Sequence, residues 1–89
     1  MLKIKLKSKF ERDVKRAQKR GKNLEKLRRA MKNLVEEKRL PKKMQDHPLR
    51  GNFVGCRECH IEPDWLLIYY VESDAVTFIR TGTHADLFQ

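Results

Sequence analysis

The chain has 89 residues, of which 37% are charged, and it carries a formal net charge of +9 at pH 7. This length supports a single small domain, residues 1–89, and no apolar run approaches the roughly 20 residues that a membrane span needs. The N-terminus alternates charged and apolar residues and so lacks the apolar core of a signal peptide, which favours a cytoplasmic protein without a membrane partner.

The first two elements are a strand and a helix. Residues 2–6 alternate apolar side chains with lysines, which predicts a half-buried strand whose lysines face water. Ser8-Lys-Phe-Glu11 fits a capping box, in which the Ser8 hydroxyl would accept a hydrogen bond from the Glu11 amide. A helix over about residues 9–20 follows, and Gly21 is placed to end it.

A second helix follows the first after two or three residues. Asn23 can cap its N-terminus, and Leu40-Pro41 is expected to end it, because the residue before a proline is pushed out of the helical region. Its apolar side chains recur at helical spacing: Leu24, Leu27, Met31, Leu34 and Val35. The short connection predicts an antiparallel helical hairpin.

The remainder of the chain predicts a loop and three strands. Proline and glycine punctuate residues 41–55, and strands are expected at 56–61, 65–71 and 75–81, joined by hairpin-length turns. The second of these is apolar throughout and should lie centrally in the sheet. The order β-α-α-β-β-β therefore predicts an α+β fold, a small twisted antiparallel sheet packed against a two-helix hairpin.

The motif Cys56-Arg-Glu-Cys59-His60 has the spacing of a haem attachment site and of half a zinc site. On a strand, however, Cys56 and Cys59 point to opposite faces of the sheet. A structural zinc site would also need a second close pair of ligands, and the sequence has none. We therefore expect the cysteines to be incidental, one of them a small core residue, and we expect no metal or cofactor.

Positive charge is concentrated in the first half of the chain. Residues 1–45 contain 18 Lys and Arg against 5 Asp and Glu, whereas residues 46–89 contain 3 against 7. So basic a half indicates a polyanionic partner, most simply nucleic acid, although a solvated surface or an acidic protein partner would use the same charge.

All three histidines fall in the second half of the chain, in loops or near strand ends: His47, His60 and His84. Histidine can act both as general base and as general acid near neutral pH. RNA cleavage by its own 2′-hydroxyl needs both roles, with an Arg or Lys to stabilise the charge on phosphorus. The residues alone thus make a ribonuclease plausible.

Three segments carry a resemblance to a known family. They read DHPLRG at 46–51, RECHIEPDWLLIY at 57–69 and RTGTHADLF at 80–88. Together they resemble the YafQ-like branch of the RelE/ParE toxin superfamily, whose fold has the order of elements given above. The resemblance implies a toxin of a bacterial type II toxin–antitoxin pair, which cuts mRNA in the ribosomal A site.

The resemblance also implies site residues and partners. The expected catalytic set is His47, His60, Asp64, His84 and Phe88. The residues expected to contact RNA are Trp65, Arg80, Arg57, Lys15, Arg16, Lys19, Arg20, Arg28 and Arg29. The expected partners are a cognate antitoxin with an acidic C-terminal segment, mRNA and the ribosome.

Roles within this set are expected as follows. His84 is the general acid toward the 5′-oxygen, and His60 or His47, oriented by Asp64, activates the 2′-hydroxyl. Phe88 either stacks on a flipped base or anchors the core. Trp65 either adjoins the site or belongs to the core. Glu58 is either a further carboxylate of the site or a surface residue.

Three other interpretations compete with the ribonuclease. A non-catalytic nucleic-acid-binding protein would keep the basic half without needing the histidines. A ParE-like gyrase inhibitor would share the fold and damage DNA instead of mRNA. A metal-binding module would bind about one zinc ion per chain.

Overall fold

Eight helices and strands follow one another in the computed structural model, which describes residues 1–88. They are β1 Lys3–Leu6, α1 Ser8–Lys19, α2 Leu24–Val35, β2 His47–Pro48, β3 Arg57–Glu62, β4 Trp65–Val71, β5 Ala75–Gly82 and α3 His84–Phe88. Two 3-10 helices, Lys42–Met44 and Gly51–Phe53, interrupt the long loop. The predicted α+β class is confirmed, with β2 and α3 added to the predicted order.

The five strands form one sheet in the order β1-β5-β4-β3-β2. β4 lies at its centre, as its continuous apolar sequence predicted. β1 pairs with β5 in parallel, whereas the other pairs are antiparallel, so the sheet is mixed and not wholly antiparallel. The parallel pair is possible because the helices and the three other strands separate β1 from β5 in the chain.

The prediction that β1 is half buried is wrong. Leu2, just before the strand, is buried, but Ile4 is 56% and Leu6 46% exposed. β1 is an edge strand, and residues 1–88 leave about half of each of these two side chains exposed. A strip of apolar surface is therefore left open along this edge.

The start of α1 differs from the prediction and its end agrees with it. Ser8 is the first helical residue and forms no capping hydrogen bond; the Glu11 amide donates to the Lys7 carbonyl instead. At the other end Gly21 has a φ of +79°, and the amides of Gly21 and Lys22 donate back into the last turn. This is the left-handed glycine cap that the sequence predicted.

α2 starts where predicted and ends earlier. The Asn23 side chain accepts from the Glu25 amide at 3.1 Å, but the helix stops at Val35, well before Leu40-Pro41. The Val35 carbonyl accepts from the Leu2 amide at 2.8 Å, and Glu37 takes a left-handed φ of 58°. A tertiary hydrogen bond and a non-glycine cap thus end the helix.

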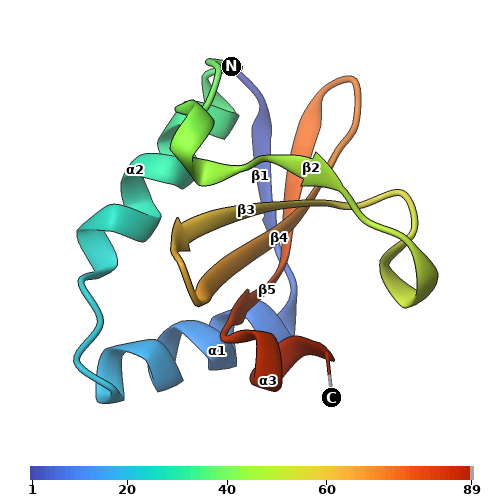
Figure 1. The fold of residues 1–89 in the computed structure, drawn as a ribbon. Helices are drawn as coiled ribbons and strands as arrows, with labels where there is room; N and C mark the ends of the chain where they lie inside the picture. The colour runs from blue at the N-terminus through green and yellow to red at the C-terminus, as the bar shows by residue number, and fades with distance from the viewer. Residues whose placement is uncertain (89) are drawn as a thin grey trace.

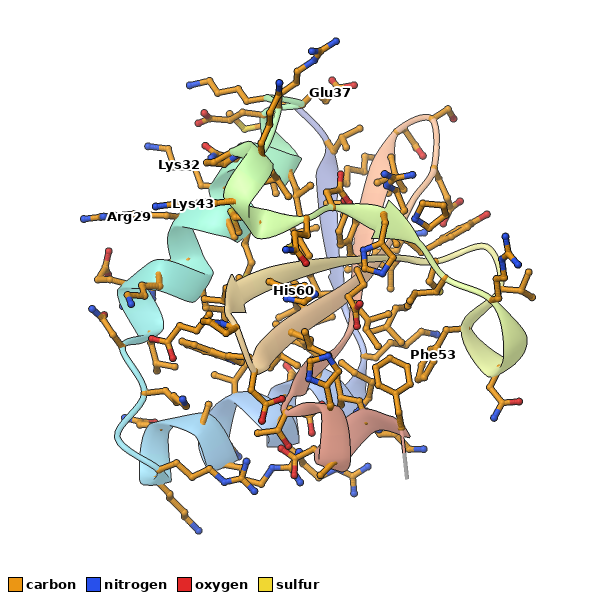
Figure 2. All side chains as sticks on the ribbon, viewed as in Figure 1. Arg29, Lys32, Glu37, Lys43, Phe53 and His60 are labelled. Carbon is orange, nitrogen blue, oxygen red and sulfur yellow. The ribbon has the colours of Figure 1, made fainter. Side chains whose placement is uncertain are left out.

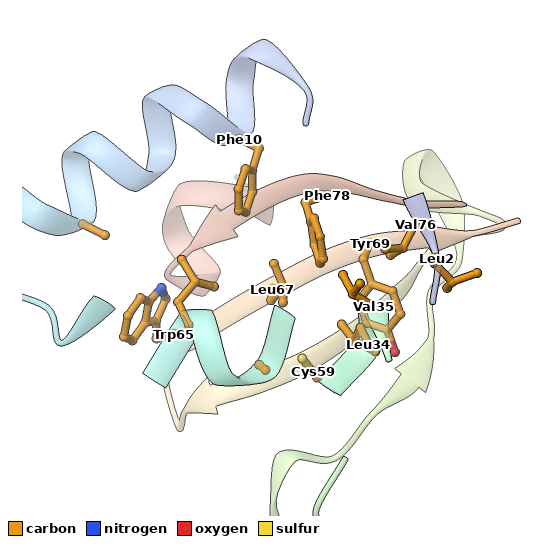
Figure 3. Packing of buried hydrophobic residues seen from close by; sticks show 13 residues of the cluster. Leu2, Phe10, Leu34, Val35, Cys59, Trp65, Leu67, Tyr69, Val76 and Phe78 are labelled. Carbon is orange, nitrogen blue, oxygen red and sulfur yellow. The ribbon is translucent and has the colours of Figure 1, made fainter. Parts of the chain in front are cut away.

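The two long helices cover one face of the sheet. Figure 1 shows α1 along the lower edge and α2 along the left side, diverging from their connection, so the predicted hairpin is open. Figure 3 shows Phe10 of α1 against Phe78 of β5, with ring centroids 5.7 Å apart, while Leu34 and Val35 of α2 lie over the other end of the sheet. Burial of these side chains supplies the main driving force for folding.

A smaller apolar cluster lies on the opposite face of the sheet, under α3 and the loop before β3. Leu66 and Ile68 of β4 and Leu87 of α3 are buried there. The partly buried side chains packed against them are Leu49, Phe53, Cys56 and Ile79. This face has no long helix over it, and it carries the histidines.

A buried carboxylate joins α1 to β5. Asp13 accepts from Arg80 Nε at 2.7 Å and Nη2 at 3.2 Å, from Arg16 Nη2 at 2.9 Å and from the Thr81 amide at 3.1 Å. Only 5% of the Asp13 side chain is exposed. Such a carboxylate is tolerated because its oxygens are fully hydrogen-bonded and its charge is matched.

A capping box begins α3. The Thr83 hydroxyl accepts from the Asp86 amide at 3.0 Å, and Asp86 Oδ2 accepts from the Thr83 amide at 2.9 Å. Arg20 of α1 donates to both Asp86 oxygens, at 2.7 and 3.2 Å. Gly82 permits this approach, since a Cβ there would lie 2.9 Å from Asp86 Oδ2. Asp86 thus fixes α3 to α1.

The two cysteines lie on opposite faces of the sheet, as predicted. Cys59 is fully buried under the helices, and Cys56 packs in the smaller cluster on the other face. Both are free thiols. Burial raises the pKa of Cys59 to about 12 and also raises the pKa of Cys56. They cannot act together as a chelating or haem-binding pair.

Thiol labelling tests this placement. At pH 8 a disulfide reagent should modify about one thiol per native chain, Cys56, because Cys59 is buried and protonated. Both thiols should react in denaturant. In Cys56→Ser the native chain should react at least about tenfold more slowly, and fast labelling of Cys59 in that variant would contradict the packing described.

The charge of Asp86 should stabilise the fold in a pH-dependent way. The Arg20 hydrogen bond, followed by those from Thr83, holds the pKa of Asp86 far below its ordinary 3.8. A depressed folded-state pKa gives stability that is present above pH 4 and is lost as the pH falls through the folded value. Asp86→Asn should lower the free energy of unfolding by about 1–2 kcal/mol at pH 7.

Urea unfolding at two pH values checks this expectation. The difference between wild type and Asp86→Asn should shrink between pH 7 and pH 3. Asp74→Asn, in the exposed turn before β5, is the matched control and should change stability by less than about 0.5 kcal/mol. An equal deficit of Asp86→Asn at both pH values would refute a charge effect.

Candidate active site

The open face of the sheet brings together the three histidines from three elements. β2 carries His47, β3 carries His60, and α3 begins with His84. Figure 2 shows His60 near the middle of this face. The ring centroids of His47 and His60 are 6.2 Å apart, and those of His60 and His84 are 5.9 Å apart. The predicted grouping of the histidines is present, with His60 at its centre.

A buried carboxylate orients His47. Nε2 of His47 lies 3.0 Å from Glu58 Oε2. Nδ1 of His47 lies 2.6 Å from the Gln45 carbonyl, which can only accept a hydrogen bond. Nδ1 must therefore carry the proton that it donates to this carbonyl. β2 pairs His47 directly with Glu58 of β3, and this register sets the contact.

Glu58 lies beneath two histidines. Its Oε2 is also 3.8 Å from His60 Nε2, and only 6% of its side chain is exposed. Its Oε1 is buried and has no hydrogen-bond partner among residues 1–88. Glu58 is therefore not the surface residue of the second expectation, and its carboxylate lies next to His47 and His60.

Asp64 orients a different histidine from the one expected. Its Oδ1 lies 2.6 Å from His84 Nδ1 and accepts from the His84 amide at 2.9 Å. These two contacts hold the pKa of Asp64 below its usual range. The expectation that Asp64 orients His60 or His47 is therefore wrong, because the turn after β3 lies beside the start of α3. Nε2 of His84 is left to face solvent or substrate.

Two phenylalanines extend the cluster. The Phe88 ring is 6.5 Å from that of His84 and 5.7 Å, edge to face, from that of Phe53. Phe88 is 47% exposed, so part of its ring is open to a base. Phe53 was not predicted: it lies in the 3-10 helix after Gly51, and no periodic pattern marks it.

The other two residues expected near the site, Trp65 and Arg80, have different surroundings. Trp65 is 1% exposed in the helical-face core, and its Nε1 donates to Thr81 Oγ1 at 2.9 Å, so it offers RNA no surface. Arg80 is held by Asp13 through Nε and Nη2, which leaves its Nη1 without a hydrogen bond to any residue from 1 to 88. Arg80 also lines a hollow together with Phe53.

Arg57 lies away from the histidines and has a structural contact. Its Nε donates to Asp46 Oδ1 at 3.1 Å, and the Tyr69 hydroxyl donates to the same oxygen at 2.6 Å. Burial, with Asp46 as the next cause, raises the pKa of Tyr69, and the hydrogen bond to Asp46 raises the pKa of Arg57. The pair anchors the residue before His47.

The six cations of the helical region that were expected to contact RNA divide into two groups. Three form ion pairs: Arg16 with Asp13, Arg20 with Asp86 and Arg28 with Glu25. The other three, Lys15, Lys19 and Arg29, form none among residues 1–88. Lys15 and Arg28 line a groove between the two long helices, on the face of the sheet opposite the histidines.

Neither a metal cluster nor a membrane helix is found in the part of the chain described. No three of its His, Cys, Asp or Glu side chains are arranged to hold a metal ion. None of its helices is long and apolar enough to span a membrane.

Comparison with known proteins gives consistent matches. The family described as bacterial toxin of type II toxin–antitoxin system, YafQ, matches residues 2–89. The mRNA interferase toxin YafQ of Escherichia coli K12 is 48% identical over 80 residues, which are 89% of this chain and 87% of that protein.

Solved structures agree with these matches. The crystal structure of YafQ from E. coli BL21(DE3) has a TM-score of 0.95 at 42% identity, with all of both chains covered. A chain of the E. coli DinJ–YafQ toxin–antitoxin complex has a TM-score of 0.92 at 44% identity, covering 99% of this chain and 98% of that one. The similarity extends over essentially the whole chain.

Proposed function

We propose that this chain, which belongs to the YafQ family of bacterial toxins of type II toxin–antitoxin systems, is an endoribonuclease that cleaves mRNA on the ribosome. One observation of the site supports this most: three imidazoles at about 6 Å ring spacing share an open face with two carboxylates. Acid–base cleavage of RNA needs two such proton-transfer groups.

The reaction would be an internal displacement at phosphorus. The 2′-oxygen gives up its proton to a histidine and bonds to the adjacent phosphorus, the bond to the 5′-oxygen breaks, and a second histidine protonates that oxygen. The products are a 2′,3′-cyclic phosphate and a free 5′-hydroxyl. Arg80 Nη1 would offset the extra negative charge on phosphorus.

The two proton-transfer roles follow from the contacts. Asp64 binds Nδ1 of His84 and so directs Nε2 outward as the proton donor to the 5′-oxygen. His60, between the other two histidines and 3.8 Å from Glu58, is placed to act as the base. His47, whose Nε2 lies 3.0 Å from Glu58 Oε2, would lie beside the phosphate.

The groove between α1 and α2 is where we place the antitoxin. The groove has a volume of about 320 Å³. Its apolar lining is formed by Leu6, Phe10, Val14, Leu24, Leu27 and Met31. It continues into the exposed Ile4 and Leu6 of the β1 edge. The groove is also lined by Glu11, Lys15 and Arg28, of which Arg28 is paired with Glu25. Lys15, which forms no ion pair among residues 1–88, suits an acidic residue of an amphipathic segment.

Replacement of His84 tests the proposed chemistry. In His84→Ala we expect cleavage of translated mRNA to slow by about 10²–10⁴-fold, because the proton donor is removed. In Asp64→Asn, which keeps the imidazole but weakens its orientation, the expected decrease is about 10²-fold. Both are measured by mapping 5′ ends of cellular mRNA within minutes of induction, and by cleavage on purified ribosomes.

Lys32→Gln, on the far side of α2, is the control and should cleave like wild type. Growth arrest with intact mRNA would redirect the assignment to gyrase inhibition or plain binding. Unchanged cleavage in His84→Ala would remove His84 from the chemistry.

A single substitution tests the antitoxin groove. Leu6→Glu should weaken binding of the co-encoded antitoxin by at least about tenfold, since it buries a charge in an apolar contact. Calorimetric titration measures this, and cleavage should be unaffected. Val71 has the same exposure as Leu6, 46%, but does not line the groove, so Val71→Glu should leave antitoxin binding unchanged. Equal weakening by both would count against this docking site.

A further inference from the structure

A basic hollow adjoins the aromatic end of the histidine cluster. Its volume is about 470 Å³. It is lined by Lys7, Ser8, Lys9, Arg12, Phe53, Ile79 and Arg80, with no carboxylate among the lining residues. Three of its cations, Lys7, Lys9 and Arg12, were not among the expected site residues; the only hint in the sequence was the run of alternating lysines at the N-terminus.

Three of the four cations that line the hollow have no counter-charge. Lys7, Lys9 and Arg12 are exposed and form no ion pair with any residue from 1 to 88. Arg80 also lines the hollow, but Asp13 holds its Nε and Nη2, and its Nη1 is the group assigned above to the scissile phosphate. A phosphate in the hollow would therefore be bound by the other three cations. The start of α1 also has no side-chain cap, so its first amides add to the positive potential.

The hollow is continuous with the proposed catalytic cluster through Phe53. This ring lines the hollow and packs on Phe88, which packs on His84. Figure 2 shows Phe53 on one side of His60 and Lys43 on the other. A nucleic-acid strand crossing the histidines would therefore pass Phe53 and enter the hollow, with a ring there for a base to stack on.

We propose that this hollow is a subsite for an RNA phosphate one or more nucleotides away from the cleaved bond, with the adjoining base against Phe53. The inference rests on the proposed ribonuclease function and adds substrate-positioning residues to it: Lys7, Lys9 and Arg12. Guanidinium and ammonium groups favour a phosphate over a carboxylate-bearing peptide here because the aromatic ring accompanies them.

Binding of a small probe tests the subsite apart from cleavage. Uridine 3′,5′-bisphosphate, titrated into the ¹⁵N-labelled full chain, should shift the amides of Ser8, Lys9, Phe53 and Arg80, and its affinity should fall with salt. The double variant Lys9→Gln/Arg12→Gln should bind about tenfold more weakly.

The control removes the same charge elsewhere. Lys32→Gln/Lys42→Gln should bind the probe like wild type; Figure 2 shows Lys32 on the side of the molecule away from Phe53. On ribosomes, the Lys9→Gln/Arg12→Gln variant should raise KM for mRNA about tenfold and leave kcat within about twofold. A plot of log affinity for RNA against log salt concentration should become less steep by about 0.7 for each RNA phosphate that the variant no longer neutralises.

Each outcome decides between the two proposals. Wild-type probe affinity and KM in Lys9→Gln/Arg12→Gln would overturn the subsite. So would an octaglutamate peptide that binds the same amides as tightly as the bisphosphate, since the hollow would then be a site for an acidic protein segment. Probe binding as expected, without mRNA cleavage by wild type, would support the subsite and reject the ribonuclease function.

Discussion

The Asp13 carboxylate is the contact on which the arrangement of the open face depends. It sits on α1 and binds the side chain of Arg80 and the backbone of Thr81, at the end of the strand that leads into α3. Because it is buried, removal of the carboxylate would leave the Arg80 guanidinium without its counter-charge, which is more costly than replacing the whole pair. One carboxylate thus aligns a helix, a strand end and an arginine beside the proposed scissile phosphate.

The position of His84 follows from a second set of local contacts. Gly82 leaves room for Asp86, Asp86 caps α3 and binds Arg20, and Asp64 receives both the amide and the ring of His84. α3 has only five residues and could not persist alone. The position of His84 is therefore determined by contacts from α1, the β3–β4 turn and β5, and not by the helix itself.

Local patterns predicted the elements whose stability is local, and failed where tertiary contacts decide. The apolar run of β4, Gly21 and Asn23 predicted a central strand and two caps. The early end of α2 and the short β2 could not be predicted, because a hydrogen bond from Leu2 and pairing with β3 determine them. In the site, residue types indicated the histidines, but their carboxylate partners depend on register. A bulge between His60 and Glu62 shifts that register before Asp64.

Glu58 shows the cost at which the site is held together. A buried carboxylate oxygen without a partner destabilises a fold by roughly 1–3 kcal/mol, and Oε1 of Glu58 is such an atom within residues 1–88. An apolar residue at this place in β3 would relieve that cost and remove the negative charge under His47 and His60. Retention of the carboxylate is understandable if the two imidazoles need it to hold a proton in place when RNA arrives. Stability at this position and proton transfer on the open face are therefore opposed.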